Sequence, residues 1–194
     1  MQNLIPRDGE VTYQPNFIPK AQADACWGEL LETTPWELKA INLFGRSVTQ
    51  PRRVCWVSGG ATLRYSGVTM TPNPWTNCLL RLKQVCEAAT GQSFNGVLMN
   101  HYRDGRDHMG WHSDDEKELG DDPVIASLSF GASRTFKLKH RTHRDLVRDI
   151  ELSHGSLLVM AGTCQRHWQH SLPRRLRVVE GRINLTFRHI LGFD

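Results

Sequence analysis

Residues 102–116 hold the highest density of metal-capable side chains in the chain. His112 and Asp114 are separated by one residue, so on an extended backbone both point to the same side, with Cα atoms about 6.6 Å apart. An imidazole nitrogen and a carboxylate oxygen at that spacing can converge on one ion. Taken alone, such a pair is more often a surface pair than a ligand pair. A metal site therefore needs a third ligand from elsewhere.

Two further histidines are candidates for that ligand. His167 and His170 lie in the segment HWQH, and spacing alone does not say which one would bind. Two histidines and one carboxylate that leave coordination positions open form the facial triad of non-haem iron(II) oxygenases. The same set could hold another divalent metal, because ligand type does not fix metal identity.

The segment 182–188 alternates like a β-strand. Its apolar residues share one face, and the other face carries Arg182, Asn184, Thr186 and Arg188. On a surface strand the arginines would simply face water. If the polar face lines the inside of a barrel, both arginines need buried anions, because an unpaired buried charge is costly. The alternation fits both cases.

The elements that must position these residues are expected as helices first and strands afterwards. Apolar residues at helical spacing predict helices over 22–33 and 74–90, and Gly91 stands where a C-cap is expected. Extended segments follow at 96–102, 124–130, 134–140, 147–152, 156–161 and 182–190, with turn signals between them. This order indicates an α+β fold whose second part is a sandwich or barrel.

Size and composition indicate one ordered unit. The chain has 194 residues, 39% of them hydrophobic and 23% charged, which excludes disordered and fibrous classes. No apolar run approaches the roughly 18 residues of a membrane-spanning helix, and no signal peptide is apparent. The five cysteines, which lack CxxC spacing, fit neither a disulfide framework nor a structural zinc site. We expect no membrane contact, no secretion and a reducing compartment.

The charge distribution permits a polyanionic partner without requiring one. The net charge is only +4, but six lysines and arginines gather between 134 and 148 with Asp145 as the one acid among them. A run of this kind is more often a solvated face than a nucleic-acid contact.

At this point four motifs in order resemble a known family. HSDDE at 112–116, HGSLLVM at 154–160, HWQHSLP at 167–173 and RINLTFR at 182–188 are similar to the AlkB family of iron(II)- and 2-oxoglutarate-dependent dioxygenases, most closely to its members that repair alkylated DNA. The resemblance spans roughly residues 43–190. It implies one dioxygenase domain over 1–194, with supporting helices and a nucleotide-recognition lid in about 1–93 and a jelly-roll, double-stranded β-helix core in about 94–194.

The resemblance also implies roles for single residues. It assigns the metal to His112, Asp114 and His170, and so selects the second histidine of HWQH. It assigns 2-oxoglutarate to Arg182 and Arg188, supported by Asn100, Tyr102 and Asn184. It assigns the recognition of the base to Glu116 or Asp115, of which Glu116 fits the duplex-acting members better. It likens Phe44, in the segment 43–45, to a hydrophobic wedge, and Tyr65 and Ser66 to part of the lid.

The implied reaction needs iron(II), 2-oxoglutarate and O₂, and it releases succinate, CO₂ and formaldehyde while it restores 1-methyladenine or 3-methylcytosine to the normal base. The implied partner is alkylated DNA, handled by a monomer in the cytoplasm, or in the nucleus if the source is eukaryotic. One alternative keeps this chemistry but acts on RNA or on methylated protein side chains. An alternative of another class is a jelly roll that binds nucleic acid without catalysis.

Overall fold

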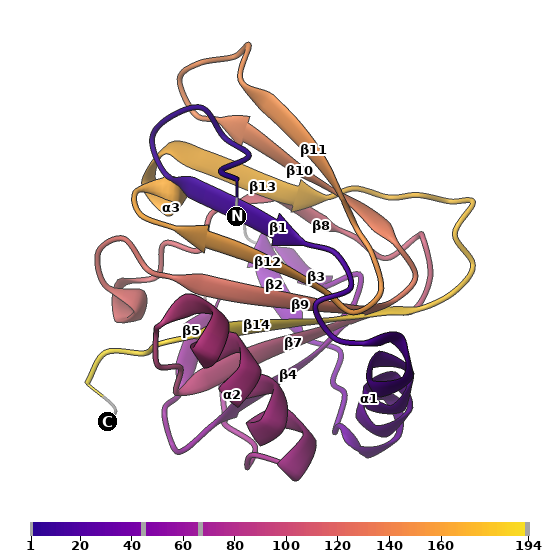
Figure 1. The fold of residues 1–194 in the computed structure, drawn as a ribbon. Coiled ribbons are helices and arrows are strands. Elements are labelled where there is room, and N and C mark those ends of the chain that lie inside the picture. The colour runs from indigo at the N-terminus through magenta and orange to yellow at the C-terminus, as the bar shows by residue number, and fades with distance from the viewer. Residues whose placement is uncertain (1, 44–45, 66–67, 193–194) are drawn as a thin grey trace.

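The computed structural model describes residues 2–43, 46–65 and 68–192, and Figure 1 shows two antiparallel sheets with the main helices on one side. The larger sheet has the order β1-β12-β9-β14-β7-β4. Its strands are β1 (Glu10–Gln14), β12 (Ser156–Ala161), β9 (Ile125–Gly131), β14 (Arg182–Arg188), β7 (Gly96–Tyr102) and β4 (Arg53–Ser58). The smaller sheet has the order β11-β10-β13-β8. Its strands are β11 (Val147–Leu152), β10 (Arg134–His140), β13 (Trp168–Leu172) and β8 (Met109–His112).

Two short hairpins and three helices complete the described part of the chain. The hairpins are β2 (Ala40–Leu43) with β3 (Arg46–Thr49), and β5 (Leu63–Tyr65) with β6 (Val68–Met70). The helices are α1 (Lys20–Thr33), α2 (Asn77–Thr90) and the single turn α3 (Cys164–His167), and a 3₁₀ turn spans Lys117–Leu119. No helix among the described residues is long and apolar enough to cross a membrane.

Helix α2 shows how local sequence sets the element ends. The Thr76 side chain accepts a hydrogen bond from the Leu79 amide and so caps the first turn. The helix therefore begins at Asn77, three residues after the expected start at 74. At the other end Gly91 adopts a left-handed conformation with φ 69°, and its N–H donates to Glu87 O. The C-cap expected at this glycine is confirmed.

The hydrophobic core has two layers, one on each face of the larger sheet. Helices α1 and α2 pack on its outer face, where Ile183, Leu185 and Phe187 of β14 are fully buried. The second layer fills the space between the sheets and joins Ile125 and Leu158 of the larger sheet to Leu138 of the smaller one. The polar face of β14 therefore looks inward, between the sheets. Two facing antiparallel sheets with helices on one side confirm the expected α+β jelly roll.

The N-terminal half contributes more strands than its sequence pattern indicates. Strands β1 and β4 lie in the same sheet as the strands after residue 94, at its two edges. The expected extended segments are present to within two residues, and those at 96–102, 134–140, 147–152 and 156–161 have the expected bounds. The strands that the pattern missed are β1, β4, β8, β13 and the two hairpins.

Candidate active site

The smaller sheet brings three metal-capable side chains together. His112 ends β8, Asp114 follows two residues later, and His170 lies in β13 directly opposite His112. One ligand atom from each residue lies within 4.8 Å of the others. Asp114 is central, because its Oδ1 is 3.8 Å from His112 Nε2 and its Oδ2 is 4.0 Å from His170 Nε2. The structure thus combines the HxD pair with the second histidine of HWQH.

Hydrogen bonds and burial hold these side chains in the form that binds a cation. His112 Nδ1 is 2.9 Å from Gly110 O, so it donates its proton there and leaves the Nε2 lone pair toward Asp114. Burial lowers the pKa of His112, and burial together with the neighbouring His112 lowers the pKa of His170 to about 3. Both imidazoles are therefore neutral at pH 7, as metal ligands must be.

Asp114 is held as an anion. Burial alone would raise the pKa of its carboxyl, but Arg188 and the two histidines outweigh burial and keep that pKa below its ordinary value. The Arg188 guanidinium lies 3.0 Å from Asp114 Oδ2. The Asp114 amide donates to Gln165 Oε1 at 2.9 Å, which fixes the backbone beside the carboxylate. Within the described residues Asp114 Oδ1 has no hydrogen-bond partner, so it is available to a metal.

The inward face of β14 supplies a buried cation to the same cavity. Arg182 is 2% exposed, and its guanidinium lies 5.4 Å from the centre of the Tyr102 ring and donates to Ser129 Oγ at 2.9 Å. Burial lowers the pKa of Arg182 to about 10, so it stays charged at pH 7. Within the described residues its Nε has no hydrogen-bond partner, and no carboxylate forms an ion pair with it. A buried cation in this state fits an anionic ligand.

Strand register aligns the other polar groups with Arg182. In the pairing of β14 with β7, Arg182 lies opposite Tyr102 and Asn184 lies opposite Asn100. Asn184 donates to Ser127 Oγ and to Leu128 O, which holds its amide in place. One cavity is lined by both groups of residues: His112, Asp114, His170, Asn100, Tyr102, Arg182, Asn184 and Arg188. Three metal ligands beside a buried arginine suit iron(II) together with a small dicarboxylate such as 2-oxoglutarate.

The two candidate acids for base recognition differ in position. Asp115 is exposed and pairs with Arg141 at 3.1 Å. Glu116 is half-buried, and burial raises the pKa of its carboxyl to about 7. Its Oε2 is shielded from water and has no hydrogen-bond partner within the described residues. Glu116 is therefore the better placed of the two to meet a buried ligand.

Three of the expected substrate contacts fall outside the part of the chain that the structure describes. Phe44 and Ser66 lie outside the described residues, and so does the side chain of Tyr65 at the end of β5.

Sequence reasoning missed Arg52. This arginine is 5% exposed, and its Nε donates to Asn100 Oδ1 at 2.7 Å. It adds positive charge near His112 and contributes to the lowered pKa of that imidazole. No local pattern marks Arg52, because its contact depends on the pairing of the β4 region with β7.

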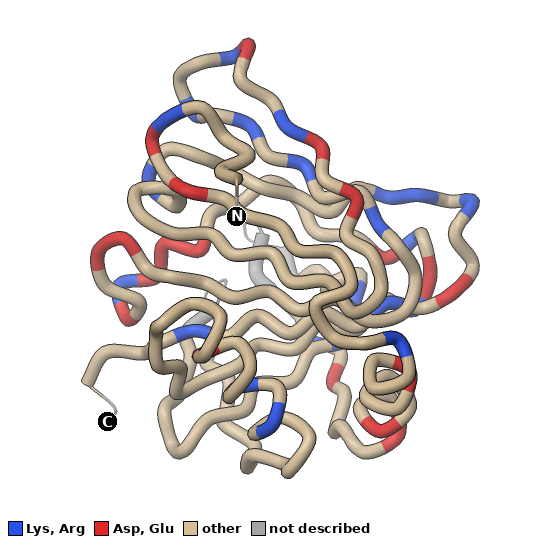
Figure 2. Tube along the Cα trace, viewed as in Figure 1, with Lys and Arg blue, Asp and Glu red and all other residues tan. Residues whose placement is uncertain are grey.

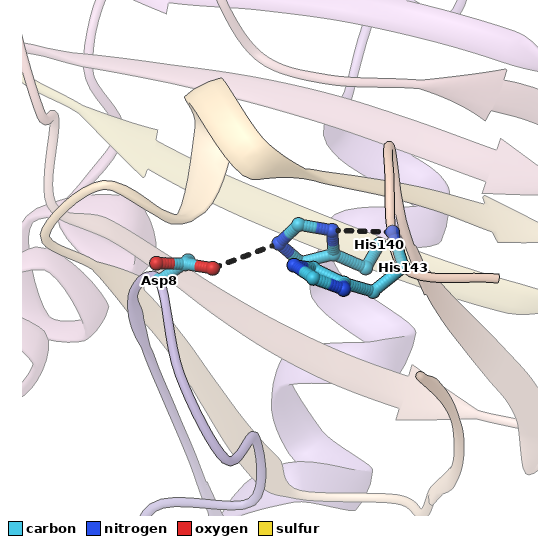
Figure 3. Close-up of side chains that lie close together, drawn as sticks. All are labelled: Asp8, His140 and His143. Carbon is cyan, nitrogen blue, oxygen red and sulfur yellow. Dashed lines mark hydrogen bonds and ion pairs between the residues drawn. The ribbon is translucent and has the colours of Figure 1, made fainter. Parts of the chain in front are cut away.

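A second cluster of metal-capable residues joins Asp8, His140 and His143 (Figure 3). The amides of Thr142 and His143 donate to His140 Nδ1 at 3.2 and 3.1 Å. The proton of this ring is therefore on Nε2, which donates to Asp8 Oδ2 at 3.0 Å. Both nitrogens of His140 are used, so the cluster is a hydrogen-bonded clasp on the N-terminal segment. The His167 ring stacks on His140 with centroids 5.9 Å apart, away from Asp114.

Comparison with known proteins agrees with this geometry. The model of the 2OG-Fe(II) oxygenase superfamily matches residues 10–188. The mouse DNA oxidative demethylase ALKBH2 is 44% identical over 185 residues, covering 89% of this chain and 77% of that protein. The rat alpha-ketoglutarate-dependent dioxygenase alkB homolog 3 is 42% identical, covering 93% of this chain and 64% of that protein. The solved structure of OsALKBH1 has a TM-score of 0.64 at 17% identity, over 95% of this chain and 99% of the other, and supports the fold. The chain therefore belongs to the AlkB family within the 2OG-Fe(II) oxygenase superfamily, whose enzymes use iron(II), 2-oxoglutarate and O₂.

Proposed function

We propose that this protein is an iron(II)- and 2-oxoglutarate-dependent dioxygenase that demethylates N-alkylated bases in DNA, with 1-methyladenine and 3-methylcytosine as substrates. The observation that carries the proposal is one cavity in which the His112, Asp114 and His170 ligand atoms adjoin the buried Arg182 cation. The DNA substrate is supported by the 44% identity to the DNA oxidative demethylase ALKBH2 of mouse.

In this proposal His112, Asp114 and His170 hold iron(II). When bound with its co-substrates, the metal supplies the oxidation that converts 2-oxoglutarate and O₂ to succinate and CO₂ and hydroxylates the N-methyl group. Arg182 binds one carboxylate of 2-oxoglutarate by charge-assisted hydrogen bonds. Asn100, Tyr102 and Asn184 orient the co-substrate, since cross-strand pairing places them beside Arg182. Arg188 keeps Asp114 ionised and directed at the metal.

Glu116 distinguishes the methylated base from its parent. Methylation at N1 of adenine or N3 of cytosine gives a cationic ring, and a carboxylate close by favours that ring over the neutral base. Hydroxylation of the N-methyl group gives a hemiaminal that releases formaldehyde and restores the base. The base must leave its stack to reach the cavity, as for other enzymes that modify bases. We also propose that the enzyme acts as a monomer in the cytoplasm, or in the nucleus if the source is eukaryotic.

A direct assay tests this function. The protein is incubated with iron(II), ascorbate, 2-oxoglutarate and oligonucleotides that carry 1-methyladenine or 3-methylcytosine, as single- and double-stranded DNA and as RNA of the same sequence. We expect formaldehyde, succinate and restored base in equal amounts from DNA, and none from Asp114→Ala. Faster repair of RNA than of DNA would change the substrate class. Demethylation of a methyl-lysine peptide without repair of either nucleic acid would overturn the proposal.

A further inference from the structure

A bulge in β8 separates one aromatic residue from the cavity. Two pairs define the register between β13 and β8, His170 with His112 and Leu172 with Met109. Two steps along β13 therefore match three steps along β8, so β8 carries one extra residue. A bulge re-aims side chains and is frequent next to active sites. Here it lets both Met109 and His112 line the cavity and leaves Trp111 42% exposed at the edge of the sheet.

Trp111 is paired with a lysine on the outer face of the smaller sheet. The Lys139 ammonium lies 4.4 Å from the centre of the Trp111 ring. Lys139 follows the inward-facing, buried Leu138 of β10, so its side chain is on the opposite, outer face. Trp111 adjoins the metal ligand His112 in sequence. The exposed indole and its lysine therefore lie on the outer face of the edge strand β8, one residue along the chain from a residue that lines the cavity.

The basic stretch around Lys139 carries fewer available charges than its sequence indicates. Figure 2 shows basic and acidic residues interspersed along β10 and β11. Lys137 pairs with Asp149 at 2.5 Å, Arg141 pairs with Asp115, and Arg134 is 1% exposed. Within the described residues no carboxylate forms an ion pair with Lys139, whose ammonium lies over the Trp111 ring. Among these four cations Lys139 is therefore the one available to an anion.

We propose that Trp111 and Lys139 bind a nucleotide that flanks the target base in the same strand. Its base or sugar packs on the exposed indole, and its phosphate pairs with the Lys139 ammonium. Aromatic side chains beside positive charge are the usual means of holding single-stranded nucleic acid without sequence preference. The choice of a nucleic-acid ligand rests on the proposed function. The new element is a contact outside the cavity, which would hold the DNA strand while one base is extruded.

Binding measurements test the contact independently of catalysis. Fluorescence anisotropy with the 194-residue apo protein and an undamaged, labelled single-stranded DNA gives Kd as a function of salt concentration. Trp111→Leu should raise Kd about fivefold or more, and Trp111→Phe should restore most of the affinity because an aromatic face returns. Lys139→Gln should lower the slope of log Kd against log salt by about 0.7, the value for one phosphate contact in a single strand.

Lys137→Gln is the matched control. It removes the same charge two residues away on the same strand, but from a lysine already paired with Asp149, so the slope should stay within error of the wild type. Equal slope changes for Lys137→Gln and Lys139→Gln, or wild-type affinity in Trp111→Leu, would overturn the inference. These outcomes are separate from a failure of the proposed function, in which the wild-type protein binds DNA but does not demethylate it.

Discussion

Arg188 and Asp114 form an ion pair of 3.0 Å in which both side chains are at most 3% exposed. The resemblance to the AlkB family assigns Arg188 to 2-oxoglutarate and Asp114 to the metal. The pair connects these two roles, because one guanidinium nitrogen is already directed at the proposed metal ligand. Arg182 has no such carboxylate within the described residues. The two arginines of the RINLTFR strand are therefore not equivalent.

Replacement of the two arginines should accordingly give different defects. Arg188→Ala should weaken metal binding about 10–100-fold, because it removes the group that keeps Asp114 ionised and oriented. Arg182→Ala should raise the KM for 2-oxoglutarate roughly 10–150-fold, the loss of a charge-assisted hydrogen bond. Cobalt(II) titration of the apo protein measures the first effect, and succinate formation against 2-oxoglutarate concentration measures the second. Arg182→Lys should restore the KM for 2-oxoglutarate only partly, because lysine cannot make the paired, planar hydrogen bonds of a guanidinium group. Unaltered cobalt affinity in Arg188→Ala would contradict the orienting role.

The sequence predicts the parts of this site that depend on local geometry. Separation by one residue was enough to place His112 and Asp114 on the same side. Alternation was likewise enough to put Arg182 and Arg188 on one face of β14. Which face points inward depends on α1 and α2, which cover the apolar face of β14, and strand periodicity does not contain that packing. The ion pair between Arg188 and Asp114 depends on contacts across two sheets and has no sequence signal.

The distal ligand is a case in which spacing left two histidines open. Register settles their positions, because His170 lies opposite His112 while His167 ends α3 and stacks on His140. We predict that His170→Ala abolishes turnover, since the proposed triad loses a ligand. His167→Ala should keep substantial activity. Formaldehyde release from methylated oligonucleotide measures both variants, and the opposite pattern would show that the ligand is misassigned.

The clasp between Asp8 and His140 should support stability without binding metal. Asp8→Ala leaves the buried His140 Nε2 proton without its acceptor, so thermal unfolding should occur at a lower temperature than in the wild type. Metal stoichiometry separates this role from a second site. Cobalt(II) titration should give one ion per chain for the wild type and for Asp8→Ala, and none for His112→Ala/Asp114→Ala. Two ions per wild-type chain, reduced to one by Asp8→Ala, would identify the clasp as a metal site.

Asp107 should contribute to stability in a pH-dependent way. Burial alone would raise the pKa of its carboxyl, but hydrogen bonds from the Arg103 side chain and amide lower it overall. Because the folded pKa lies below the unfolded one, the stabilisation is present above about pH 4 and is lost as the pH falls through the folded value. Asp107→Asn should lower the free energy of unfolding at pH 7 by roughly 1 kcal/mol, or about 2–4 °C.

The acid limb of the melting profile tests the sign of this effect. The difference in melting temperature between the wild type and Asp107→Asn should narrow as the pH is lowered below about 4. Asp149→Asn is the control, because its pair with Lys137 is exposed and should contribute at most about 0.5 kcal/mol. If the difference in melting temperature between the wild type and Asp107→Asn widened in acid, the pKa of Asp107 would not be lowered by folding.

The bulge in β8 and the buried Arg52 mark the limit of sequence reasoning at this site. A four-residue strand containing glycine, MGWH, has no alternation long enough to identify it as a strand. The extra residue in β8 becomes visible only through its register with β13. Arg52 contacts Asn100, which lies 48 positions further along the chain. Such contacts arise when distant strands pair, and composition and spacing do not encode them.

Glu116 and Asp115 are neighbouring acids in different environments, so a comparison of their variants tests which one selects the base. Glu116 is half-buried with a shielded carboxylate oxygen, whereas Asp115 is exposed and paired with Arg141. Glu116→Gln keeps the shape of the side chain and removes its charge. It should therefore reduce kcat/KM for cationic 1-methyladenine by roughly tenfold, about 1.4 kcal/mol of lost attraction. The kcat/KM for the neutral base 1-methylguanine, in the same oligonucleotide, should fall much less, because a neutral base is not attracted by the charge of Glu116. Asp115→Asn should change neither kcat/KM value more than a few-fold.

Equal losses of kcat/KM on both bases in Glu116→Gln would mean that Glu116 supports the pocket and does not recognise charge. A larger loss in Asp115→Asn than in Glu116→Gln would assign base recognition to Asp115.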